Sequence, residues 1–433
     1  MRTERASIPE RETAPALWAD ATFRKAMALW VVLVVVVAIK AIVSPRHHTV
    51  FPLLMSGPRH WWAGKDIYDV YPELFDIYRY SPSNALLFSP LAPLPDRVGG
   101  AIWCVVNLGV LVFGLIAAAR HVFPGRWPAA RIGGLLALVM VGAIRSGWNS
   151  QSNPLVIGLI LLGASAIARD RGWSAAVLLA IPIFMKLSPL AIALLFVALW
   201  PRQLLARFLA VMAAGVALPF LTMPTQFVVS QYQHWIVGLA QSSATRWPAF
   251  RDAYTLWELT GYPVHLPAYR ALQLGAGLAT LFWSQWLARR LPGARGRLTA
   301  TLAMGTAYLL VFGPAVEYPS YVVLTPMVAW GVLAAYRRRK GRVWVTLAFA
   351  LTVVVGSEAI EVPLDRLTPL ARASLPLGSI LFAAWVARYA RTMTSEADRE
   401  PEPEPELSAS GRKWERRRWR RGAVGRDCPI TAR

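Results

Sequence analysis

Charged residues are scarce in this chain of 433 residues, since Asp, Glu, Lys and Arg together make up 16 %. Soluble globular proteins carry roughly 25 % charged residues, so the composition argues against a soluble enzyme. Cysteine is nearly absent, and the two cysteines, Cys104 and Cys428, lie in an apolar segment and in the C-terminal tail. We therefore expect no disulfide and no cysteine chemistry.

Several common motifs are also missing. The sequence has no Walker loop, no dinucleotide-binding fingerprint, no HExxH and no CxxC. Nothing therefore indicates a nucleotide or another cofactor. Because no cluster of metal-ligating residues stands out either, we expect no metal ion.

Acidic residues are much rarer than basic ones, with 24 Asp and Glu against 46 Lys and Arg, a formal net charge of +22. Such a charge fits either nucleic-acid binding or basic loops on the cytoplasmic side of a membrane. The basic residues lie between long apolar blocks and not on one soluble face. We therefore favour the loops and expect no nucleic-acid partner.

What the chain does have is apolar sequence, with 55 % hydrophobic residues and a mean hydropathy of +0.41. Long apolar blocks separated by short basic loops predict an all-α polytopic membrane protein. We expect about twelve transmembrane helices. They cover residues 25–43, 98–119, 131–147, 153–168, 174–185, 187–199, 205–222, 269–288, 299–313, 318–335, 343–357 and 375–390.

The basic residues also predict the topology. Residues 1–24 form a cytoplasmic N-terminal segment, residues 25–395 the transmembrane domain, and residues 396–433 a disordered basic cytoplasmic tail that contains EPEPEPE at 400–406. The protein is then a multi-pass protein of the cell inner (plasma) membrane with both termini in the cytoplasm. Two long loops, 44–97 and 223–268, fall on the outer face. The proline-rich segment 82–95 is expected to be re-entrant or interfacial.

The first outer loop is rich in groups that can do chemistry. It carries aromatic rings beside carboxylates, which suits a sugar, although tryptophan and tyrosine also form a belt at membrane surfaces. Polar groups recur at the ends of spans, where Asn149, Gln151 and Asn153 can cap a helix or bind a ligand. Lys186 lies between two apolar segments, where a lysine either snorkels to the interface or pairs with an anion such as phosphate.

Four segments carry a family resemblance. They are GKDIYD at 64–69, RYSPSNALLFSPLAPLP at 79–95, NSQSNPLV at 149–156 and MKLSPL at 185–190. Together they resemble glycosyltransferase family 87, over roughly residues 26–340. The resemblance implies a membrane enzyme with the type C glycosyltransferase fold. It also implies a polyprenyl-phosphate sugar donor, with mannose as the sugar, used on the outer face.

The resemblance also suggests roles for residues. The family carries an aspartate, read as the catalytic base, soon after the first span, where this chain has RHHTVF with His47 and His48. The base is then His48 or His47, with Asp66 and Asp76 as alternatives, and it takes a proton from an acceptor hydroxyl of a lipid or glycan. Lys186, with Arg79 or Arg145, neutralises the donor phosphate as it leaves, and the transfer inverts configuration. The residues expected to bind the sugar or the acceptor are Tyr68, Tyr80, Asn149, Gln151, Asn153, Arg251, Asp252, Glu317 and Tyr318.

Two other functions stay open from the sequence. A secondary transporter or flippase of lipid-linked or small polar substrates would share the spans, the intramembrane lysine and the proline-broken segments. A non-catalytic family relative would explain the missing aspartate.

Overall fold

The computed structural model describes residues 14–395 except 73, 75, 245–248 and 292. Within this range the chain is helical and has no β-strand. Residues 1–13 of the predicted N-terminal segment and the whole predicted tail, 396–433, lie outside the described residues.

Five described helices are long and apolar enough to cross a membrane. They are α2 (Ala21–Val43), α5 (Asp96–His121), α6 (Ala129–Trp148), α10 (Pro201–Ala217) with its extension η2 (Leu218–Leu221), and the stretch Pro369–Tyr389. That stretch spans η5 (Pro369–Ala373) and most of α18 (Ser374–Ser395). A sixth candidate, Arg342–Val355 with Glu358–Asp365, is bent by 80°. The prediction of an all-α integral membrane protein is therefore confirmed.

Three further apolar helices are shorter. They are α7 (Asn153–Ala168), α8 (Gly172–Met185) and α9 (Leu190–Leu199). With a rise of 1.5 Å per residue, α9 is about 15 Å long, about half of the ~30 Å hydrocarbon layer. Each of the twelve predicted spans coincides with a helix, but the number of membrane crossings stays a prediction.

The remaining helices connect or flank these. In the first predicted outer loop lie α3 (Phe51–Trp62), α4 (Pro82–Phe88) and η1 (Ser89–Leu91), and in the second lie α11 (Thr225–Ala244) and α12 (Ala253–Glu258). The others are α1 (Ala14–Ala19), α13 (Leu266–Ala288), α14 (Ala294–Phe312), η3 (Tyr318–Val323), α15 (Thr325–Arg338), α16 (Arg342–Phe349), η4 (Ala350–Val355) and α17 (Glu358–Asp365).

Local chemistry explains where the long helices begin and end. Asp20 caps α2, because its carboxylate accepts a hydrogen bond from Phe23 N at 2.9 Å. Helix α5 has Asp96 in its first turn and Arg120 and His121 in its last turn, which complements the helix dipole at both ends.

Two glycines let α5 and α7 pack backbone against backbone. A Cβ atom on Gly158 would lie 2.7 Å from Val110 O, and one on Gly114 would lie 2.6 Å from Gly158 O. Small residues at such crossings allow close packing of membrane helices. This contact fixes the start of α7, which carries Asn153.

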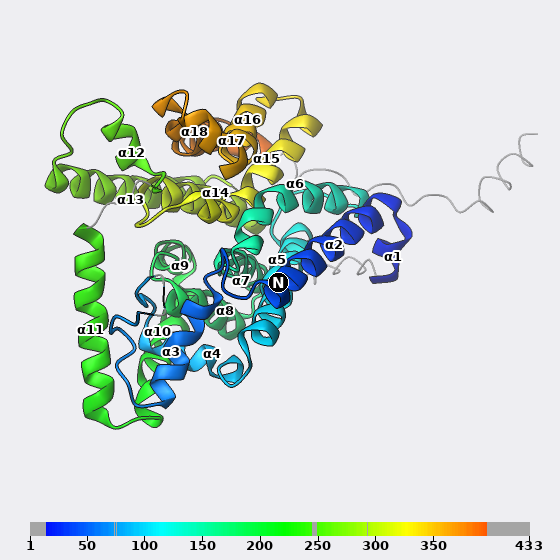
Figure 1. The fold of residues 1–433 in the computed structure, drawn as a ribbon. Helices are drawn as coiled ribbons and strands as arrows, with labels where there is room; N and C mark the ends of the chain where they lie inside the picture. The colour runs from blue at the N-terminus through cyan, green and yellow to red at the C-terminus, as the bar shows by residue number, and fades with distance from the viewer. Residues whose placement is uncertain (1–13, 73, 75, 245–248, 292, 396–433) are drawn as a thin grey trace, which may run out of the picture. The chain divides into compact units, whose positions relative to one another are not determined.

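A small apolar core holds the first loop against α11. It is formed by Trp61, Ile67, Tyr78, Ala85 and Val228. Helix α11 contacts α4 and η2, and Figure 1 displays it at the edge of this loop region. The contact brings residues of the two predicted outer loops together.

Candidate functional site

One cavity surrounds the break between α8 and α9. Its lining includes Lys186, Ser188 and Pro189 from the break, Asn153 from the start of α7, and Ser320 from η3. Its volume is about 20 Å³. Leucine, valine and proline side chains from α7, α14, η3 and the α14–η3 link complete the wall.

The electrostatics of this cavity favour an anion. Lys186 is half-buried, and its ammonium makes no hydrogen bond or ion pair with any residue that the structure describes. Glu317 acts on its charge only through space. The N-termini of α7 and α9 lie at the same cavity, and helix N-termini carry partial positive charge.

Polar groups beside the cavity are held by hydrogen bonds. Asn153 Nδ2 donates to Gln151 Oε1 at 2.7 Å, and Asn107 Nδ2 donates to Gln151 O at 2.7 Å. Asn149 ends α6, and its carbonyl accepts from Val50 N at 2.9 Å. The sequence NSQSNP therefore forms a rigid polar turn between α6 and α7.

A second cavity lies between the first loop and α11. Its lining includes Asp66, Tyr68 and Arg79 from the loop, and His234 and Trp235 from α11. Its volume is about 220 Å³. Asp69, Tyr78 and Gln241 also line it, so it offers charges of both signs, hydroxyls, an amide and an indole ring.

Asp66 makes two close polar contacts at this loop cavity. Its Oδ1 accepts from Tyr68 N at 2.9 Å, and its Oδ2 lies 2.6 Å from His234 Nδ1. Burial raises the pKa of Tyr68 far above its usual range, so its hydroxyl stays protonated and donates to Tyr80 O at 2.7 Å. Arg79 forms an ion pair with Asp76.

A short chain segment connects the two cavities. Arg79 lines the loop cavity, and its carbonyl accepts from Trp235 Nε1 at 3.2 Å. Two residues later, Ser81 Oγ donates to Phe184 O at 2.7 Å, at the end of α8 next to Lys186. Tyr80, between them, is half-buried and feels the charge of Glu317. Segment 79–81 therefore runs from the loop cavity to the end of α8, which precedes Lys186.

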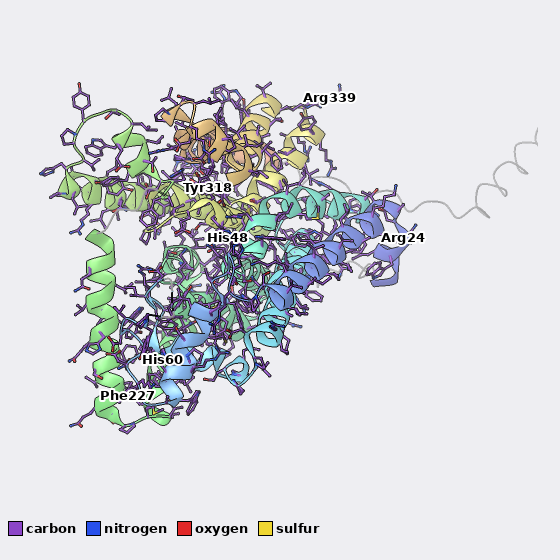
Figure 2. The ribbon with its side chains drawn as sticks, viewed as in Figure 1. Arg24, His48, His60, Phe227, Tyr318 and Arg339 are labelled. Carbon is purple, nitrogen blue, oxygen red and sulfur yellow. The ribbon has the colours of Figure 1, made fainter. Side chains whose placement is uncertain are left out.

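Three other predicted site residues lie in salt bridges or caps. Arg145 pairs with Glu358, donating from Nη2 to Oε1 at 2.6 Å. Arg251 pairs with the fully buried Glu361 at 2.5 Å and donates from Nη2 to the Tyr318 hydroxyl at 2.5 Å. Asp252 caps α12, accepting from Thr255 N at 3.2 Å. Tyr318 is labelled in Figure 2.

The two adjacent histidines lie elsewhere. His47 and His48 are exposed at the link between α2 and α3, with ring centroids 4.1 Å apart. The His48 carbonyl accepts from Lys40 Nζ at 2.8 Å, and Figure 2 labels His48 close to this junction. Neither histidine lines the lysine cavity or the loop cavity.

Sequence reasoning missed His234, Glu358 and Glu361 as partners of site residues. His234 lies in a segment expected to be an outer loop, far in sequence from Asp66. No local pattern connects them. The only signal was that both lie in the two predicted outer loops, which the fold brings together. No group of three or more His, Cys, Asp or Glu in the part of the chain that the structure describes is arranged to hold a metal ion.

Comparison with known proteins gives a family and a solved structure. The model described as "Glycosyltransferase family 87" matches residues 78–314, more than half of the chain. Among solved structures, the chain is similar to ArnT from Cupriavidus metallidurans, a crystal structure with bound undecaprenyl phosphate. The identity is 14 %, the match covers 86 % of this chain and 78 % of that chain, and the TM-score is 0.38. No curated protein matches the chain.

Proposed function

The chain belongs to glycosyltransferase family 87, and on this premise we propose that it transfers a sugar from a polyprenyl-phosphate donor to an acceptor hydroxyl. The sugar is mannose, as the family likeness implies, and the acceptor is a lipid or a glycan. The reaction takes place on the outer face of the membrane, because the positive-inside rule assigns the two loops of the site to that side.

One observation carries the donor assignment. Lys186 is a half-buried cation that lacks a hydrogen-bond or ion-pair partner in the described part of the chain, and it lines a cavity between helix ends. An unpaired lysine at membrane depth is costly and usually binds something. A lipid phosphate supplies the missing charge, and the apolar wall of the cavity suits the first carbons of a polyprenyl chain.

The chemistry of the leaving group agrees with this site. When the bond between the anomeric carbon and the phosphate oxygen breaks, negative charge develops on the phosphate. A fixed cation and two helix N-termini stabilise that charge without acid catalysis. Asn153 and Gln151, held by their mutual hydrogen bond, are the groups we assign to the donor sugar's hydroxyls.

The loop cavity is the acceptor side of the proposal. Asp66, Tyr68 and Trp235 line it, and aromatic rings beside carboxylates suit a sugar-bearing acceptor. Among the four bases considered from sequence, Asp66 lines one of the two cavities, whereas His47, His48 and Asp76 line neither. We therefore assign proton removal to the loop cavity, which Asp66 lines.

The test uses the purified full-length protein in liposomes with a lipid extract of the host as acceptor. Polyprenyl-phosphate mannose and GDP-mannose, each labelled in the sugar, are supplied in parallel. The proposal predicts labelled product from the lipid donor and none from the nucleotide donor. Transfer from GDP-mannose alone, or no transfer from polyprenyl-phosphate mannose, overturns it.

A further inference from the structure

Asp66 and His234 form a close contact between a carboxylate and an imidazole in the loop cavity. His234 Nδ1 lies 2.6 Å from Asp66 Oδ2. A carboxylate accepts from a ring N–H, so this contact favours the tautomer with the proton on Nδ1. The other ring nitrogen, Nε2, is then left with a lone pair. It makes no hydrogen bond with the residues that the structure describes.

Both partners of this pair are held in place. On α11, Gln231 lies one turn before His234, is 2 % exposed, and accepts from Ile67 N at 3.0 Å. Trp235, directly after His234, donates to Arg79 O at 3.2 Å. On the loop side, Asp66 Oδ1 accepts from Tyr68 N at 2.9 Å. These bonds therefore hold α11, which carries His234, against the loop that carries Asp66.

We propose that His234 Nε2 is the general base of the sugar transfer and that Asp66 orients it. The inference rests on the function proposed above. An imidazole takes a proton efficiently near neutral pH, whereas a carboxylate engaged by Tyr68 N and His234 already uses both of its oxygens. The arrangement of carboxylate, Nδ1–H and free Nε2 is the one that serves histidine bases on unrelated folds.

The step balances as a single displacement. The acceptor hydroxyl gives its proton to His234 Nε2 and forms the new bond to the anomeric carbon. The bond from that carbon to the phosphate oxygen breaks, and its electron pair leaves with the polyprenyl phosphate. The imidazolium that forms is stabilised by the Asp66 carboxylate, and it later releases its proton to water.

Two substitutions separate a base from a positioning residue. In His234→Asn the side-chain amide NH₂ takes the place of Nδ1, so a polar N–H group still faces Asp66 and only Nε2 is lost. In His234→Ala the imidazole is removed from an open cavity, because the side chain is 51 % exposed, and added imidazole can enter. His265→Ala is the matched control, since His265 is exposed and precedes α13.

The assay measures transfer from labelled polyprenyl-phosphate mannose, with donor KM determined separately and folding checked by size-exclusion chromatography. We expect His234→Asn to lower kcat by about 10²- to 10⁴-fold, the usual contribution of a general base, with donor KM unchanged. Added imidazole restores part of the activity of His234→Ala and none of that of Asp66→Asn. His265→Ala behaves as wild type.

The outcomes that overturn the inference differ from those that overturn the proposed function. If wild type transfers sugar and His234→Asn keeps its kcat, or if imidazole does not restore His234→Ala, His234 is not the base. If wild type transfers nothing from any lipid donor, the proposed function fails and this inference fails with it.

Discussion

The buried ion pair between Arg251 and Glu361 gives the sharpest stability prediction. The two side chains are 5 % and 0 % exposed, and Arg251 Nε lies 2.5 Å from Glu361 Oε1. The Tyr318 hydroxyl also donates to Glu361 Oε1 at 3.0 Å. The cluster joins the link before α12 to η3 and α17, so we interpret it as a structural lock of the three segments.

Replacing Glu361 with glutamine keeps the volume but removes the buried carboxylate that pairs with Arg251. Breaking a buried pair in this way costs about 3–5 kcal/mol. The matched control is Asp365→Asn on the same helix. Its pair with Arg372 has side chains 19 % and 41 % exposed, and such surface pairs contribute about 0–1 kcal/mol.

The assay measures the unfolding of the detergent-purified protein by heat or by denaturant. We expect Glu361→Gln to lower stability far more than Asp365→Asn does. The double variant Arg251→Met/Glu361→Met removes both charges, and we expect it to recover most of the loss. Equal effects of Glu361→Gln and Asp365→Asn, or no recovery in the double variant, would refute the interpretation as a lock.

Two further substitutions test the packing that positions the lysine cavity. Gly158→Val would place a Cβ 2.7 Å from Val110 O, so we expect it to lower the free energy of unfolding by about 1–3 kcal/mol through overpacking. Gly275→Val is the control, because its Cβ would meet no atom within 4 Å, and we expect a smaller loss in the same unfolding assay. Asn107→Leu removes the hydrogen-bond partners of Leu155 N at 2.8 Å and of Gln151 O at 2.7 Å. We expect it to lower the free energy of unfolding by about 1–3 kcal/mol for each buried group left unpaired. A melting temperature equal to that of wild type would contradict the role of Asn107 as the anchor of this turn.

Hydropathy predicted the positions of the helices well. Each predicted span coincides with a helix, because a run of about 20 apolar residues is easily recognised in the sequence and is the length of a helix that crosses the hydrocarbon layer. The lengths were predicted less well. The span predicted over 187–199 is a helix only from Leu190 to Leu199, since Pro189 and the bend after Lys186 delay its start.

The second outer loop was the least predictable part of the fold. Its sequence from Thr225 to Ala244 mixes apolar and polar residues, so hydropathy gives no span there, yet it forms a 20-residue helix. That helix brings His234 to Asp66. Because such a contact depends on the packing of distant segments, no local spacing in the sequence predicts it.

The candidate site also contains some residues that local sequence features indicate and others that only the fold brings close. Lys186 and Asn153 could be recognised from sequence, because a lone lysine between apolar segments and a polar run at a helix start are local features, and both line one cavity. The partners of Arg145 and Arg251 could not, since Glu358 and Glu361 lie more than 100 positions away along the chain. A charged residue near a predicted span end gives no sign of whether it is paired.

The most direct test of the central claim is the effect of Lys186 on the lipid donor. Wild type, Lys186→Met and Lys65→Met are compared for binding and transfer of labelled polyprenyl-phosphate mannose in liposomes; Lys65 is exposed and lines neither cavity. We predict that Lys186→Met loses donor binding and transfer together, because the phosphate loses its cation, while Lys65→Met matches wild type. A Lys186→Met protein that binds and transfers as wild type does would contradict the account.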